Sequence, residues 1–268
     1  MYSMSLKHMA ALASLSAATL LPGNLNAQPA PVPFTEQNTA TPDKLEILSI
    51  ARKVADWQIK EFPNNKYAVK EPKGWIAGAL YMGMFDWAEL SGDNQYFDWL
   101  KKVFNRQHWQ VADRMYHADD VCVSQTYIDM YTKYKEDKML LPTTARIDWV
   151  INNPSNGGLD IDYSKPLSYE RWSWCDALFM APAVYTRLYT LTGNKKYMIF
   201  ADAEFKATYN HLYDKDDKLF FRDSRYFGQQ EANGKKVFWG RGNGWVIGGL
   251  AEILKTLPAE DTEYRPFY

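Results

Sequence analysis

The sequence predicts an all-α fold of stacked αα-hairpins, and three observations lead to this prediction. Apolar residues recur with the period of a helix through most of the chain after residue 41. Strand-like patterns are limited to two short segments, 218–224 and 235–239. A weak internal repeat places a helix, a glycine turn and a second helix in succession. Repeats of this kind stack side by side in a ring or a solenoid.

The helices are expected in a regular order along the chain. The first begins after Thr41-Pro42 and has a broad apolar side over residues 43–62. Seven further helices are expected, over residues 75–90, 94–109, 119–134, 142–151, 175–191, 194–211 and 244–257.

Glycines and short polar residues mark the turns between these helices. Gly92 and Gly193 fit the C-cap position, and Asp93 or Asn194 can then cap the helix that follows. An Asn233-Gly234 turn between the two strand-like segments favours one small β-hairpin, inserted between helices.

Three of the expected helices begin with a residue that can contact a ligand. Trp75 follows Gly74, Asp176 follows Trp174-Cys175, and Trp245 follows Gly244. In a ring of hairpins these helices line the inside, and their N-termini face one rim. We therefore expect Trp75, Asp176 and Trp245 to converge at one mouth.

The N-terminus has the pattern of a targeting segment. Lys7 and His8 precede an apolar run over residues 9–21, and small residues follow up to Ala27. We expect a signal peptide over residues 1–27, cleaved after Ala27, and a disordered Pro- and Ala-rich leader over residues 28–41. The folded domain is then residues 42–268, exported to a periplasm or secreted.

Composition argues against several classes of function. The 31 Lys and Arg nearly balance the 32 Asp and Glu and are scattered, so neither nucleic acid nor a membrane is expected as a partner. Cys122 and Cys175 are too few for a disulfide framework and are expected to be buried thiols. No Cys and His cluster has metal-ligand spacing, and neither a metal nor another cofactor is indicated. Ten Trp and eighteen Tyr favour carbohydrate as the ligand.

Two stretches contain the candidate site, residues 171–180 and 238–245. The first offers the carboxylate of Asp176 beside Trp174, and the second offers the guanidinium of Arg241 between Trp239 and Trp245. Indole rings stack on sugar faces, arginine binds a carboxylate in a bidentate fork, and a desolvated acid can donate a proton. A pocket for an acidic sugar needs these groups. A structural role also fits each of them: a helix cap for the acid, a loop brace for the arginine, core packing for the indoles.

The chain resembles the unsaturated uronyl hydrolases, most closely the unsaturated rhamnogalacturonyl hydrolases of glycoside hydrolase family 105, which are related to the unsaturated glucuronyl hydrolases of family 88. The resemblance covers about residues 43–257 and rests on three motifs, at 117–120, 174–182 and 239–245. It implies an (α/α)6 toroid. It also implies hydrolysis of unsaturated galacturonyl-rhamnose fragments of pectin, the products of a polysaccharide lyase. The expected partner of the chain is such an oligosaccharide.

The resemblance also implies roles for individual residues. Asp176 would protonate C4 of the C4=C5 double bond as general acid and then activate the water that adds at C5. Asp120, or its neighbour Asp119, would be the second carboxylate of the pocket. Arg241 would bind the uronate carboxylate, with Trp239 and Trp245 as stacking walls.

Some positions leave alternatives open. Family members often have a His where this chain has Arg222, which points to a different sugar beyond the cleaved bond or to a different carboxylate contact. His117 is either a substrate contact or a structural histidine, and Trp75 is either pocket or core. A toroid of this class needs twelve helices and eight are expected here, so the domain is expected to be incomplete at its C-terminus.

Two other functions compete with the unsaturated uronyl hydrolase. One is an inverting glycosidase that uses Asp120 and Asp176 on a saturated glycan, which requires carboxyl groups roughly 6.5–9.5 Å apart. The other is a toroid that binds sugar without catalysis. The sequence leaves the oligomeric state open.

Overall fold

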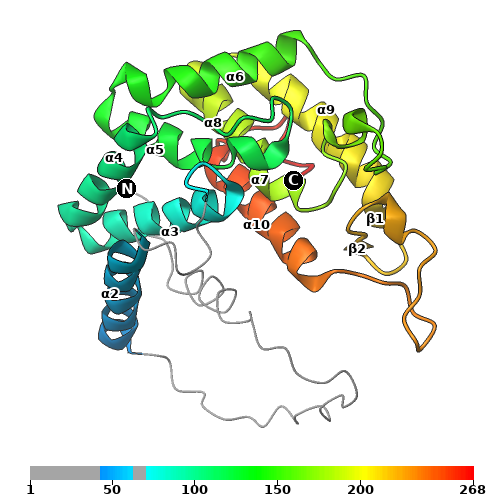
Figure 1. Cartoon of the computed structure of the whole chain (residues 1–268), viewed down its shortest axis with the longest axis horizontal. Coiled ribbons are helices and arrows are strands. Elements are labelled where there is room, and N and C mark those ends of the chain that lie inside the picture. Colours follow the sequence, from blue (N-terminus) through cyan, green and yellow to red (C-terminus); the bar gives the residue numbers. More distant parts are fainter. Residues whose placement is uncertain (1–42, 63–70) are drawn as a thin grey trace. The chain divides into compact units, whose positions relative to one another are not determined.

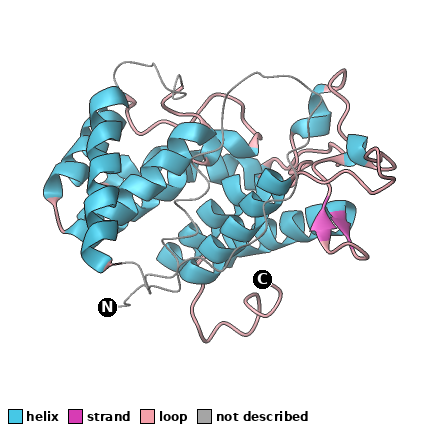
Figure 2. Ribbon diagram, turned by 90° about the horizontal axis from the view of Figure 1, so that it is seen from below, coloured by secondary structure: helices cyan, strands magenta, loops and turns pink. Residues whose placement is uncertain are grey.

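Helix-forming residues dominate the computed structural model, which describes residues 43–62 and 71–268. The expected signal peptide, its cleavage after Ala27 and the leader over 28–41 lie outside the described residues. The described chain from Lys44 onward forms one unit (Figure 1). Almost all its regular structure is helical, with a single pair of short strands (Figure 2). The predicted all-α class is therefore confirmed.

The helices follow one another as αα-hairpins with short 3-10 turns between them. The α-helices are α2 (Lys44–Glu61), α3 (Trp75–Ser91), α4 (Asn94–Arg106), α5 (Ser124–Tyr134), α6 (Leu141–Asn152), α7 (Ala177–Met180), α8 (Pro182–Thr192), α9 (Lys195–Leu212) and α10 (Gly240–Thr256). The 3-10 helices are η2 (Ala118–Val121), η3 (Asp137–Met139), η4 (Pro166–Tyr169) and η5 (Ser224–Tyr226). The strands are β1 (Tyr213–Asp214) and β2 (Leu219–Phe220).

The two predicted glycine turns close the hairpins α3–α4 and α8–α9. Gly92 and Gly193 have φ angles of 66° and 69°, which favour glycine, and their N–H groups donate to the last turn of the preceding helix. Asp93 and Asn194 then accept hydrogen bonds from backbone N–H groups of α4 and α9, at 3.1 Å in both cases. The caps predicted from the sequence are confirmed.

Other boundaries differ from the prediction. The helix expected over 175–191 is broken into α7 and α8, because Pro182 has no backbone N–H to continue the helical hydrogen bonds. Strand β2 does pair in a hairpin, but with β1, so that Tyr213 lies opposite Phe220. The expected second strand over 235–239 is wrong, since that segment contributes only an isolated bridge between Gln230 and Lys236.

The helices pack in two rows, one made of α3, α5, α8 and α10 and the other containing α4 and α9. Contacts run from α3 to α5, from α5 to α8 and from α8 to α10, while α4 packs on α3 and α9 packs on α8. Two apolar cores fill the spaces between them, one around α3, α4 and α5 and the other around α7 to α10. The contacts of α3, α7 and α10 bring the starts of these helices toward one side, as the repeat predicted.

Two glycines allow α10 to approach its neighbours closely. A Cβ atom on Gly249 would lie 2.1 Å from the carbonyl oxygen of Leu178, and one on Gly242 would lie 2.7 Å from Sγ of Cys175. No real side chain fits at such distances, so the α7–α10 packing requires glycine at both positions. Gly242 follows Arg241, so this contact also determines where Arg241 stands.

A buried cation joins helices α5, α8 and α10. Arg187 of α8 is 7% exposed and bonds Asp129 of α5 at 3.0 Å and Glu252 of α10 at 2.6 Å. Both carboxylates therefore balance one guanidinium inside the fold. No helix among the described residues is long and apolar enough to cross a membrane.

Candidate active site

A cleft of about 820 Å³ opens where the starts of α3, α7 and α10 meet the loops around them. Its wall includes most of the residues that the sequence predicted for a site: Trp75, His117, Asp119, Trp174, Asp176, Arg222, Trp239 and Arg241. Asp120 and Trp245 do not line it. The structure thus brings together side chains from five separate segments of the chain.

Asp176 stands at the N-terminus of α7 and points its carboxylate into the cleft. It occupies the cap position, yet its side chain makes no capping hydrogen bond. Its Oδ1 atom is buried and has no hydrogen-bond partner among the described residues. Burial raises the pKa of Asp176 to about 6, against the opposing effect of Arg222 and Arg241. This carboxyl group therefore keeps its proton to a higher pH than an ordinary aspartate does.

Asp119 on η2 is the second carboxylate in the cleft. Its Oδ1 atom is also buried without a partner in the described part of the chain, and its Oδ2 lies 3.8 Å from the Arg114 guanidinium. Burial, followed by the negative charge of Asp176, raises the pKa of Asp119 to about 7. Of the two acids, Asp119 therefore keeps its proton to the higher pH.

Asp120 takes a different position although it is the next residue. It is 3% exposed, and its oxygens accept hydrogen bonds from the Arg114 backbone N–H at 2.7 Å and from the Arg114 Nε at 3.0 Å. Both oxygens of this carboxylate are therefore occupied by hydrogen bonds from Arg114, which stabilise the loop before η2. Of the two adjacent acids, the structure places Asp119 in the cleft and Asp120 behind it.

His117 lies between the acids and an aromatic wall. Its ring centroid is 4.6 Å from that of Trp174, and its Nδ1 accepts a hydrogen bond from the backbone N–H of Asp119 at 3.3 Å. Burial and the charge of Arg114 lower the pKa of His117 to about 4. The imidazole is thus neutral and holds the start of η2, while one face remains in the cleft.

Opposite the acids, two guanidinium groups lie over one indole. Arg241 is 4.8 Å and Arg222 is 5.4 Å from the centroid of Trp239. Arg241, in the first turn of α10, is exposed and forms no ion pair with any described carboxylate. A cation that is held by stacking and makes no ion pair with a described residue is suited to binding an anionic ligand.

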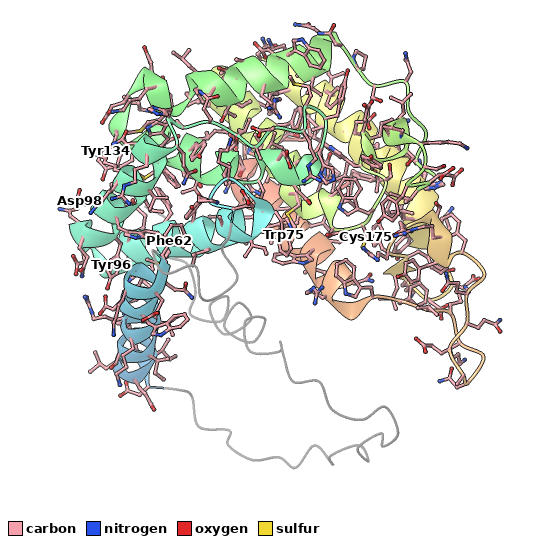
Figure 3. All side chains as sticks on the ribbon, in the orientation of Figure 1. Phe62, Trp75, Tyr96, Asp98, Tyr134 and Cys175 are labelled. Atoms are coloured by element: carbon pink, nitrogen blue, oxygen red, sulfur yellow. The ribbon has the colours of Figure 1, made fainter. Side chains whose placement is uncertain are left out.

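Trp245 packs behind Trp75. Its ring lies edge-on to that of Trp75 at a centroid distance of 5.9 Å and tilted against that of Phe179 at 4.6 Å. Trp75 stands at the start of α3, close to α10, and lines the cleft (Figure 3). Of the two indoles, Trp75 is in reach of a ligand, and Trp245 braces it.

Several residues of the wall come from loops and were not predicted as site residues from the sequence. Arg114, Tyr163, Tyr169, Asp223 and Tyr226 all line the cleft. They belong to segments without helical periodicity, so no pattern places them near the acids. The cluster of arginine and aspartate over residues 222–225 was the one available signal. Among the described residues, no group of His, Cys, Asp and Glu has the arrangement of a metal site.

The sequence of this chain matches one protein family over most of its length. A profile described as Glycosyl Hydrolase Family 88 matches residues 50–268. The chain belongs to this family. The predicted resemblance to the unsaturated uronyl hydrolases is thereby confirmed, and solved structures described as family 105 members share the fold.

Two curated relatives of this family 88 chain are both named unsaturated 3S-rhamnoglycuronyl hydrolase. The protein from Alteromonas sp. is 34% identical over 226 residues, which cover 78% of this chain and 55% of the relative. The protein from Formosa agariphila is 38% identical over 205 residues, which cover 74% of this chain and 54% of the relative. The chain spans about half the length of the curated relatives it matches.

A solved structure supports the architecture. A family 88 glycosyl hydrolase from Bacteroides vulgatus superposes with a TM-score of 0.65 at 25% identity, over 81% of this chain and 64% of that protein. The helical hairpins described above are thus those of the α/α toroid fold of families 88 and 105.

Proposed function

We propose that this chain forms the active site of a hydrolase for oligosaccharides that end in an unsaturated uronic acid. The observation that carries the proposal is the pair Asp119 and Asp176. Both carboxylates are buried in one cleft, and each retains an oxygen without a partner among the described residues. Their raised pKa values leave a proton on the pair near neutral pH, and such a group can act as general acid.

The proposed reaction begins with protonation of the C4=C5 double bond. Asp176 donates its proton to C4, and the electron pair of the double bond forms the new C4–H bond. Water then adds at C5, where the ring oxygen stabilises the positive charge, and its proton returns to the Asp176 carboxylate. The resulting hemiketal opens to a ketone at C5 and a hemiacetal at C1, which releases the neighbouring sugar as an alcohol.

In this scheme one carboxyl group serves first as acid and then as base. Asp119, whose own pKa is raised by burial and by the charge of Asp176, forms hydrogen bonds with sugar hydroxyl groups. Arg241 binds the uronate carboxylate, and Trp239 stacks on the sugar ring. Protonation of a vinyl ether needs no second catalytic acid, unlike hydrolysis of a saturated glycoside.

The names of the two relatives favour rhamnose as the sugar next to the unsaturated residue. We therefore propose an unsaturated uronyl-rhamnose substrate, such as the unsaturated galacturonyl-rhamnose fragment of pectin. Arg222, on the Trp239 wall, is positioned to contact the sugar beyond the cleaved bond.

The competing functions have less support. An inverting glycosidase would use Asp120 as base, but Arg114 already occupies the oxygens of that carboxylate. A binding protein without catalysis has no need for two buried carboxylates with unpartnered oxygens. We also propose, from the pattern over residues 1–27, that the protein is exported, which fractionation of cells expressing the tagged chain would test.

The experiment follows the ultraviolet absorbance of the conjugated C4=C5 bond in lyase digests of rhamnose-containing polyuronides. The native chain should remove the absorbance, and Asp176→Asn should reduce the rate by at least about a thousandfold, as expected on loss of the only proton donor. Asp119→Asn should be strongly impaired. Asp113→Asn, an exposed acid of the same segment, should act like the native chain.

Loss of the Asp120 carboxylate should have a different effect. Asp120→Asn should lower the melting temperature, because Arg114 loses its buried partner, whereas Asp119→Asn should not. Failure of a folded native chain to consume any of these digests, or full activity of Asp176→Asn, would contradict the proposed function.

A further inference from the structure

Asp223 is a buried carboxylate in the wall of the cleft that the reaction above does not use. Its side chain is 2% exposed. Its Oδ1 accepts hydrogen bonds from Nε of Arg225 at 2.8 Å and from the Arg225 backbone N–H at 3.1 Å, and its Oδ2 accepts one from Nη2 at 2.9 Å. Nε of Arg222 lies 3.7 Å from Oδ2. One carboxylate thus stands against two guanidinium groups.

Each of these arginines reaches an aromatic residue of the cleft. Arg225 lies 4.4 Å over the ring of Tyr163 and donates a hydrogen bond to its hydroxyl group at 3.1 Å. Arg222 lies over Trp239. Tyr163 and Trp239 come from loops far apart in the sequence and both line the cleft. Asp223 therefore connects two parts of the wall that have no secondary structure in common.

The same segment is fastened to the backbone just before Asp176. Asp223 and Trp174 form an isolated antiparallel bridge, and the backbone N–H of Cys175 donates to the carbonyl oxygen of Arg222 at 2.8 Å. These contacts hold the charged groups of residues 222–225 at a fixed place relative to the Asp176 carboxylate.

The charged groups around Asp176 act in opposite directions. Burial is the largest cause of its raised pKa, Arg222 and Arg241 oppose it, and Asp223 reinforces it. Asp119 faces the same carboxyl group from η2. Burial raises the pKa of the neighbouring Cys175 thiol to about 12, so this group stays neutral.

We propose that Asp223 is a positioning residue, which holds Arg222 and Arg225 against the two aromatic walls and balances their charge behind Asp176. The proposal deepens the proposed function, on which its consequence for catalysis rests. Without the Asp223 charge, the two arginines that lower the pKa of Asp176, Arg222 and Arg241, lose a charge that opposes them. The acid then loses its proton at lower pH, and less of it can protonate C4 at neutral pH.

The first test is the pH dependence of kcat/KM for three variants. In Asp223→Asn the alkaline limit of activity, which is the pH above which kcat/KM falls, should move down by about 1 pH unit, as expected on removal of a nearby charge. In Arg225→Met it should move up, because Asp223 then loses a positive neighbour. Glu136→Gln, which removes an exposed acid paired with Lys138, should leave the limit unchanged. Rates that fall in both cleft variants at an unchanged pH limit would refute the proposal.

The second test needs no substrate. Asp176→Asn should be more stable than the parent, and this gain in stability should be larger at pH 8 than at pH 4. The increase of the gain between pH 4 and pH 8 should become smaller when both proteins also carry Asp223→Asn. In the Arg225→Met background it should become larger, which keeps the test valid if Asp223→Asn does not fold. An equal increase in all backgrounds would overturn the role of Asp223. If the pH-dependent gain in stability changes as expected but the parent turns over no unsaturated sugar, the role of Asp223 stands and only the proposed function is contradicted.

Discussion

Replacement of Asp176 by asparagine should stabilise the folded chain at alkaline pH. Burial raises the pKa of Asp176 from the usual 3.8 to about 6. A carboxyl group with a raised folded-state pKa favours folding when it is protonated. That contribution is fully present below pH 3.8 and is lost as the pH rises through about 6. At pH 8 the folded chain contains an ionised carboxylate that water would solvate better.

The size of the effect follows from the two pKa values. The interval from 3.8 to about 6 corresponds to about 3 kcal/mol at roughly 1.4 kcal/mol per pKa unit. Asparagine has nearly the same shape and no charge to bury. We therefore expect Asp176→Asn to be more stable than the parent by up to about 3 kcal/mol at pH 8, and by a small fraction of this at pH 4.

The assay is urea denaturation of both proteins at several values between pH 4 and pH 8. Asp113→Asn, which removes an acid whose side chain is 94% exposed, serves as the control and should show no pH-dependent gain. Parallel stability curves for the parent and Asp176→Asn would show that this carboxyl group titrates normally, and the argument for a buried proton donor would fail.

Three further predictions concern packing, buried charge and ligand binding. Gly249→Ala should lower the stability by at least about 2 kcal/mol in a thermal melt, because its Cβ would collide with the Leu178 carbonyl oxygen; Gly83→Ala, with nothing within 4 Å, should be neutral or stabilising. Arg187→Met should destabilise by about 3–5 kcal/mol, since two carboxylates would lose their buried partner; an unchanged urea midpoint would contradict this. Arg241→Lys keeps the charge but loses the fork, so KM should rise about tenfold with a smaller change in kcat; equal KM values would mean that another residue binds the uronate.

The sequence predicted the hairpins well because local chemistry decides them. Gly92 and Gly193 end helices through left-handed backbone, and the acid or amide that follows begins the next helix, wherever the hairpin lies in the fold. The break at Pro182 was not predicted, because the apolar periodicity continues through it and concealed the missing N–H group.

The site could be predicted only as far as residues on helix starts. Asp176 and Arg241 lie there, and the sequence placed them together. Which of Asp119 and Asp120 enters the cleft depends on how Arg114 folds back onto the loop, and this is a tertiary contact without a sequence pattern. Asp223 escaped notice because its importance lies in two arginines that converge on it in space.

The missing side chain at Gly242 has a consequence for how the site responds to motion. Arg241 stands next to it on α10, and Asp176 stands next to Cys175, whose sulfur fills the space that a Cβ atom would take. The proposed proton donor and the proposed anion-binding cation are therefore each one residue away from the same van der Waals contact, between Cys175 and Gly242. The spacing between the proposed acid and the proposed uronate anchor therefore does not depend on the loops that contact the sugar beyond the cleaved bond. Tolerance for varied leaving sugars and strictness toward the unsaturated residue can thus coexist in one cleft.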